Sequence, residues 1–222
     1  MVRDQLLEIY RLLLERFGPQ HWWPGRTPFE VIVGAILTQN TSWTNVAKAI
    51  ANLKAADLLD PAKLHKIDLP ELEKLIRPAG YFRLKAKRLR NFTQWLFDRY
   101  EGNLERLDEI DARRLREELL EISGIGQETA DSILLYGLKR PIFVVDTYTA
   151  RVAVRHFLIE PELTYDALQD LFQSNLDADT QFFNEFHALI VRVGKEYCRP
   201  KALCPACPLN VLPHDPNAGL SE

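Results

Sequence analysis

The sequence has few cysteines: three among 222 residues, all within ten positions of one another near the end of the chain. An odd and clustered set argues against a framework of disulfides and favours a metal site. No apolar run approaches the roughly 20 residues that cross a bilayer. The first residues form a charged amphipathic pattern, which is not typical of a signal peptide. We therefore expect a cytoplasmic protein with no membrane partner.

An excess of positive charge is also missing. Lysine and arginine number 28 against 31 acidic residues, which gives a net charge of -3 and a pI near 6.0. Such a chain has no global attraction for a nucleic acid, so any polyanion must be bound locally. Residues 74–90 offer seven cations and no acid. Taken alone, this stretch is more typical of an ordinary solvated helix surface.

The hydrophobic pattern predicts an all-α protein. Residues 4–17 place apolar side chains on one stripe of a helix, with the 3.6-residue period of an amphipathic helix. Residues 29–39 are rich in β-branched residues, but their length and the lack of a partner run favour a buried helix. Further helical patterns end at Asp, Pro or Gly. They cover residues 42–54, 60–66, 70–77, 84–100 and 111–121.

Residues 119–135 read as a helix, a Ser-Gly-Ile-Gly turn and a second helix. Gly124 and Gly126 permit a tight bend and a close approach of the backbone. The first amides of the second helix, beginning at Gln127, then lack partners within the helix and can bind one DNA phosphate. This would let an acidic protein bind DNA. The simpler interpretation is a plain connection between helices.

Several segments together resemble the endonuclease III family of helix-hairpin-helix DNA glycosylases. They are the hairpin, the Val-Val-Asp-Thr-Tyr sequence at 144–148, the Gln-containing segment at 37–42, the stretch from Gly80 to Arg88, and the terminal cysteines. The resemblance implies an all-α helix-hairpin-helix DNA glycosylase fold with two helical lobes and a cleft between them. One lobe would comprise residues 1–28 and 139–222, and the six-helix lobe residues 29–138. The implied partner is double-stranded DNA containing damaged bases, bound by a monomer.

The same resemblance assigns roles to single residues. Asp146 is implied as the catalytic aspartate, although its position also suits the cap of a helix. Bifunctional members form a Schiff base through a lysine in the second hairpin helix, and Glu128 occupies that position here. A carboxylate cannot form an imine, so we expect a monofunctional enzyme, with Lys139 as a less favoured substitute nucleophile. Gln39 is implied to fill the gap left by the flipped nucleotide.

Within this family, the segment from Trp22 to Thr41 and the Gly-Ile-Gly-x-Glu hairpin are most similar to the 3-methyladenine branch. An alkylated purine carries a positive charge and is attracted to aromatic faces. Trp22 and Trp23 are therefore candidates for the substrate pocket, and packing in the core is the alternative.

Cys198, Cys204 and Cys207 resemble the iron–sulfur loop of the family, which has four cysteines and binds a [4Fe–4S] cluster. Here the fourth cysteine is absent. His214 can supply the fourth ligand, with Asp215 or an exogenous group as lesser candidates. Zinc, held by three cysteines and a histidine, is the alternative metal, and a relic site without a metal is the simpler interpretation.

Three functions remain open from the sequence. The first is base excision repair by a DNA glycosylase, a hydrolase of the N-glycosidic bond, acting on alkylated purines. The second is an endonuclease III-like glycosylase for oxidised pyrimidines, with weak or absent AP-lyase activity. The third is a DNA-binding module without catalysis, which would have no use for a carboxylate near DNA.

Overall fold

The computed structural model describes residues 2–162 and 164–219, which form helices and loops without a β-strand. The chain divides into two compact units. We call Met1–Trp22 with Pro141–Glu222 the terminal unit, and Trp23–Arg140 the central unit. The expected all-α class is confirmed. None of the described helices is long and apolar enough to span a membrane.

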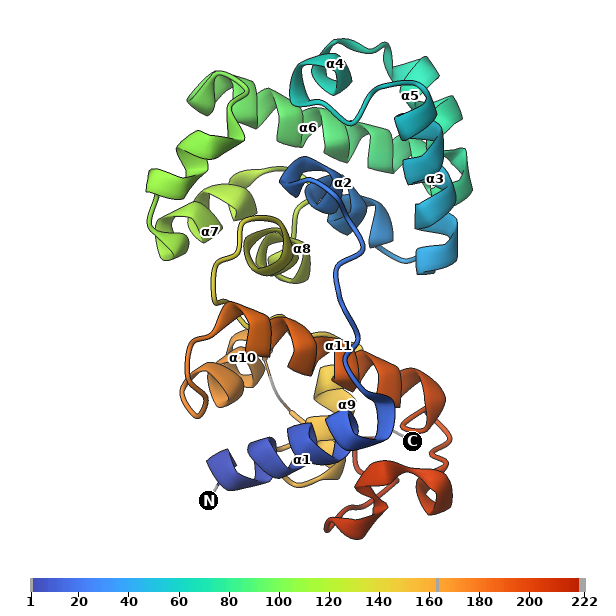
Figure 1. Ribbon diagram of the computed structural model, residues 1–222, viewed down its shortest axis with the longest axis vertical. Coiled ribbons are helices and arrows are strands. Elements are labelled where there is room, and N and C mark those ends of the chain that lie inside the picture. The colour runs from blue at the N-terminus through green and yellow to red at the C-terminus, as the bar shows by residue number, and fades with distance from the viewer. Residues whose placement is uncertain (1, 163, 220–222) are drawn as a thin grey trace. The chain divides into compact units, whose positions relative to one another are not determined.

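The central unit is built around α2, Pro28–Thr38, in which every residue from Phe29 to Leu37 is buried. The β-branched run is thus a helix, as its length predicted. Thr27 caps its first turn by accepting a hydrogen bond from the amide of Glu30, a common helix start. Figure 1 labels the other α-helices of this unit, α3 to α8. The elements that follow α2 in the unit are α3 (Trp43–Ala55), α4 (Pro61–Lys66), α5 (Leu69–Leu75), η1 (Arg77–Ala79), α6 (Phe82–Tyr100), η2 (Leu104–Glu109), α7 (Ala112–Glu121), α8 (Gln127–Ser132) and the π-helical η3 (Ile133–Gly137).

The terminal unit brings together the two ends of the chain. An aromatic cluster fills its core, with the rings of Phe143 and Phe172 stacked at 4.2 Å and Phe183 edge-on to Phe143 at 5.2 Å. Its elements are α1 (Val2–Phe17), α9 (Thr147–Arg155), α10 (Tyr165–Gln173), α11 (Thr180–Glu196), η4 (Cys204–Ala206) and η5 (Pro208–Val211).

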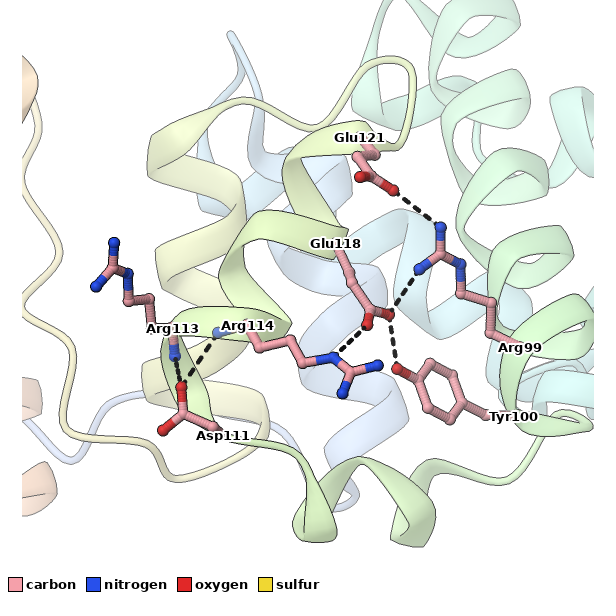
Figure 2. A network of polar contacts seen from close by, with 7 residues as sticks. All are labelled: Arg99, Tyr100, Asp111, Arg113, Arg114, Glu118 and Glu121. Atoms are coloured by element: carbon pink, nitrogen blue, oxygen red, sulfur yellow. Dashed lines mark hydrogen bonds and ion pairs between the residues drawn. The ribbon is translucent and has the colours of Figure 1, made fainter.

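Ionic contacts hold α7 in the central unit. The carboxylate of Glu118 is 8% exposed, accepts a hydrogen bond from the Tyr100 hydroxyl at 2.6 Å, and pairs with Arg99 at 3.2 Å and Arg114 at 3.3 Å (Figure 2). Burial and the bond to Glu118 raise the pKa of Tyr100 to about 12, so its hydroxyl stays a donor. This network fixes the helix that leads into the hairpin.

Candidate active site

Asp146 lies at the start of α9, after a buried extended segment. Phe143, Val144 and Val145 are each 1% exposed or less. The segment has no neighbouring strand, so side chains of α10 satisfy its backbone: Gln169 donates to the Phe143 carbonyl at 2.8 Å, and the Phe143 amide donates to Gln173 at 2.9 Å. These bonds fix the chain immediately before Asp146.

The Asp146 carboxylate caps α9. One oxygen accepts from the Thr149 amide at 2.8 Å and from the Thr149 hydroxyl at 2.9 Å. The other lies 3.7 Å from Nε2 of His187 on α11. The expected cap is therefore present, and it leaves one oxygen facing an imidazole.

Burial and these neighbours act in opposite directions on the charge of Asp146. Its side chain is 11% exposed, and such burial acts to raise a carboxyl pKa. His187 and the two Thr149 donors outweigh that effect, and the pKa is lowered below its ordinary value. The structure thus holds a shielded carboxylate in its charged form, as stabilisation of a developing cation requires.

Trp22 and Trp23 separate into different environments. The ring of Trp22 packs edge-on to His187 at 6.1 Å, and the Trp22 carbonyl accepts from Asn184 at 2.8 Å. Within the terminal unit, His187 thus contacts both the Trp22 ring and the Asp146 carboxylate. Trp23 belongs to the central unit, where it contacts Trp43 at 5.3 Å and Tyr136 at 5.0 Å. The two adjacent indoles do not share one environment.

The predicted hairpin joins α7 and α8 in the central unit. Gly124 has φ +96°, the left-handed region that favours glycine. A Cβ there would lie 2.5 Å from Cγ of Arg88, whereas one on Gly126 would meet nothing within 4 Å. Ile125, 4% exposed, anchors the turn between them. Arg116 and the buried Asp131 join the two helices with contacts of 2.6 and 3.1 Å.

Gln39 follows α2 as expected, but its side chain contacts the hairpin. Its amide nitrogen donates to the Gly124 carbonyl at 3.1 Å and to the Thr129 hydroxyl at 2.8 Å, and Arg88 donates to its oxygen. In this conformation the Gln39 side chain supports the hairpin turn. Glu128 lies exposed in the first turn of α8, and Gln127 begins that helix.

The basic stretch at 74–90 is less available than its composition indicated. Lys85 is 1% exposed and donates to the Ala79 carbonyl at 2.7 Å, and burial lowers its pKa to about 8. Arg90 donates to the Ile67 carbonyl, and Arg88 is engaged with Gln39. The number of cations in a stretch does not show which of them face the core, so the sequence could not predict that Lys85 is buried.

The three cysteines line one pocket of the terminal unit. Arg155, His156 and His214 also line it, as do Tyr197 and Leu209. Burial and the two other thiols raise the pKa of Cys207 to about 11. Asp215 is turned to its own loop, where it accepts from the Asn217 amide at 2.9 Å. Among the described residues, no group of three Cys, His, Asp or Glu side chains converges as ligands of a single metal ion would.

Arg155 places a buried positive charge beside this pocket. Its side chain is among the largest fully buried ones, and the residue is 2% exposed. It donates to Sγ of Cys198 at 3.3 Å and to the carbonyls of Arg199 and Pro200, while its buried Nε has no hydrogen-bond partner. No carboxylate among the described residues pairs with it. A buried cation of this kind requires a nearby negative charge.

The sequence does not single out three residues that contribute to these sites. His187 and His156 are single histidines, and nothing in their spacing marks them. Arg155 directly precedes His156 and looks like a normal basic residue at a helix end. Only Thr149 carried a signal, since a hydroxyl three residues after an N-cap Asp can return a hydrogen bond to it.

Comparison with known proteins identifies the family. Residues 33–177 match the model of the HhH-GPD superfamily base excision DNA repair protein. The chain belongs to this superfamily. It is 50% identical over 208 residues, 93% of this chain and 94% of the relative, to "Putative DNA repair glycosylase MJ1434" of Methanocaldococcus jannaschii. It is 30% identical to an endonuclease III of Thermotoga maritima, covering 90% of this chain and 88% of the relative.

Solved structures agree with this membership. The H. pylori 3-methyladenine DNA glycosylase MagIII, bound to 1,N6-ethenoadenine, matches with a TM-score of 0.73 and 30% identity, over 88% of this chain and 97% of that chain. An endonuclease III–DNA complex matches with a TM-score of 0.81 at 22% identity, over 98% and 97% of the chains, which shows the shared fold. The chain is therefore an endonuclease III-like helix-hairpin-helix DNA glycosylase of base excision repair.

Proposed function

We propose that this glycosylase hydrolyses the N-glycosidic bond of alkylated purines in double-stranded DNA, without cleaving the strand. The observation that carries the proposal is the Asp146 carboxylate, which is charged, shielded and held by Thr149 and His187. Its negative charge would face the sugar as cationic character develops there. The third hypothesis, binding without catalysis, leaves this costly arrangement without a purpose.

The chemistry that the site must supply is modest for such a substrate. When the glycosidic bond breaks, its electron pair goes to the base, and a cationic alkylated purine leaves as a neutral molecule. Water then adds to the sugar carbon and loses a proton, which the carboxylate or solvent accepts. The base must first be extruded from the stack. No acid is needed to protonate the leaving base.

The side chain at position 128 supports a hydrolytic reaction. Glu128 lies in the first turn of α8. By the resemblance described above, bifunctional members of the family have a lysine at this position. Lys139 donates to the Tyr136 carbonyl at 3.0 Å and sits at φ +56° after η3. Its amine is thus engaged in a local contact that a nucleophile would have to break.

The aromatic neighbour of the carboxylate supports the choice of substrate. Trp22 lies against His187, which in turn faces Asp146. A flipped purine near this carboxylate would therefore have an indole within reach for stacking, which contributes about 1–3 kcal/mol per aromatic contact. MagIII, a relative at 30% identity, was solved with an alkylated adenine, 1,N6-ethenoadenine. The similarity to the T. maritima endonuclease III keeps oxidised pyrimidines as the second candidate.

The hairpin is proposed to bind DNA through its backbone. Gly124, Gly126 and Gln127 would present amides to one phosphate, and Gln39 would either support the turn, as it does here, or enter the duplex. The partner is double-stranded DNA, and we expect a monomeric enzyme.

The cysteine pocket is proposed to hold a [4Fe–4S] cluster. The buried and unbalanced Arg155 is the observation in favour, because thiolates of a cluster would supply the missing negative charge. Each thiolate of such a cluster binds a different iron, so the thiols line a pocket without converging on one point. Zinc, held by three cysteines and a histidine, is the alternative metal. Bound there, the cluster would stabilise the fold by linking the three cysteines.

A lesion panel tests the proposed activity. Duplexes that each carry one defined lesion are incubated with excess enzyme, and released bases and strand breaks are scored before and after alkali. We expect release of 3-methyladenine, with strand breaks only after alkali. Release of thymine glycol without release of methylated purines would favour the second candidate, and efficient borohydride trapping of a protein–DNA adduct would show that the enzyme is a lyase.

A further inference from the structure

Two histidine side chains line the cysteine pocket, whereas the sequence pointed to His214 alone. His156 and His214 both face it, with ring centroids 5.5 Å apart. We propose that His156, at the end of α9, is the fourth ligand of the cluster. This inference rests on the cluster proposed above and replaces His214 as the ligand.

The hydrogen bond of His156 leaves the correct atom for a metal. Nδ1 lies 3.1 Å from the Pro213 carbonyl, which can only accept, so Nδ1 carries the proton. Nε2 then carries the free lone pair. A ligating histidine usually donates its other ring N–H to a carbonyl in this way.

The imidazole of His156 lies inside the protein, and the residue is 8% exposed. A histidine binds a metal in its neutral form. A neutral ligand also suits the charge of the pocket, because one guanidinium, Arg155, then faces one thiolate fewer than in a site with four cysteines.

The two histidines differ in what positions them. His156 is the C-cap of α9, a helix that packs against α11, and it follows Arg155, which contacts Cys198. His214 is less buried and lies in the loop after η5, where Nδ1 contacts the carbonyl of Leu212 two residues away at 2.8 Å. A ligand placed by a rigid element is better preorganised than one placed by its own loop.

Nitrogen coordination can be measured without any assay of activity. The full chain is produced anaerobically with 15N-histidine, reduced, and studied by pulsed electron paramagnetic resonance. We expect a strong hyperfine coupling from one histidine nitrogen. His156→Cys should abolish this coupling and keep the iron and sulfide content, because cysteine supplies a fourth thiolate. The matched variant His214→Cys should keep the coupling.

The outcomes separate the two proposals. A coupling that survives in His156→Cys and disappears in His214→Cys would assign the ligand to His214 and overturn the inference while the cluster stands. A wild-type cluster without histidine coupling would also overturn it, in favour of Asp215 or an exogenous ligand. Absence of iron and sulfide from anaerobic wild-type protein would reject the cluster itself. Circular dichroism of each variant identifies any that fail to fold.

Discussion

The two ends of α9 each bury a charge, but the protein balances only one of them. At the first end, Asp146 receives two hydrogen bonds from Thr149 and faces His187. At the other end, Arg155 donates to carbonyls and one thiol and meets no carboxylate among the described residues. The first end is thus complete in the folded chain, whereas at the second the thiolates of the cluster proposed above would supply the missing negative charge.

The hairpin repeats this contrast on a smaller scale. A Cβ on Gly124 would collide with the side chain of Arg88, whereas one on Gly126 would meet nothing within 4 Å. The first glycine is required by the fold itself. The second is required only if something outside the chain, such as a phosphate, approaches it.

The largest effect, a loss of excision rate, is expected from removing the charge of Asp146 at the start of α9. Asp146→Asn should lower the single-turnover rate of excision by roughly 10²-fold or more, the scale of a positioned electrostatic or acid–base group. Asparagine caps helices about as well as aspartate, so the variant should keep the start of α9 and fold. Rates on a duplex with one alkylated purine provide the measurement.

A matched variant controls for the cap. Asp179 is exposed and caps α11 by accepting from the Phe182 amide at 2.6 Å. Asp179→Asn makes the same chemical change at another cap of the same unit and should leave excision unchanged. Equal rates for Asp146→Asn and wild type would refute the catalytic assignment.

The second-largest effect is expected at the Arg155 end of α9, where the cluster is proposed to bind. Removal of the cluster by a chelator under oxidation should lower the melting temperature by about 5–10 °C, since a tightly bound ligand contributes several kcal/mol and each kcal/mol corresponds to about 2–4 °C in a chain of this size. Calorimetry before and after removal measures the shift.

The variant Arg155→Met tests whether the buried cation causes part of that loss. Methionine fills much of the same space without a charge, so the metal-free variant no longer buries an unbalanced cation. Its melting temperature should fall less than that of wild type when the cluster is removed. An equal fall in both proteins would show that the thiolates alone account for the effect.

The glycine pair should produce a smaller but sharper difference. Gly124→Ala places a side chain at φ +96° and 2.5 Å from Arg88, which should cost roughly 1–2 kcal/mol of stability. Gly126→Ala meets nothing within 4 Å and should change stability by less than about 0.5 kcal/mol. Yet Gly126→Ala should weaken DNA binding, because its methyl group occupies the approach of the phosphate. Wild-type affinity in that variant would place the phosphate elsewhere.

The sequence predicted well what depends on periodicity and local chemistry. The strand-like run became the buried α2, the turn at Gly124 adopted its left-handed backbone, and Asp146 became a helix cap. It could not predict contacts across long separations. His187 lies 41 positions beyond Asp146 in the sequence and yet faces its carboxylate. Lys85 of the basic stretch at 74–90 is buried in the core. Such facts depend on how helices pack, which the pattern of one helix does not contain.

The last prediction expects almost no effect over the usual pH range. His187 and Thr149 lower the pKa of Asp146 despite its burial, so at pH 5 the carboxylate should remain about nine-tenths ionised or more, given an ordinary value near 3.9.

A depressed folded-state pKa adds stability above the unfolded pKa, and this stability is lost as the pH falls through the folded value. The difference in unfolding free energy between wild type and Asp146→Asn should therefore be constant from pH 5 to pH 8 and shrink only below about pH 4. Denaturant titrations across this range measure it. A difference that already shrinks near pH 6 would mean that His187 and Thr149 do not outweigh burial, and that the first end of α9 is less complete than its contacts indicate.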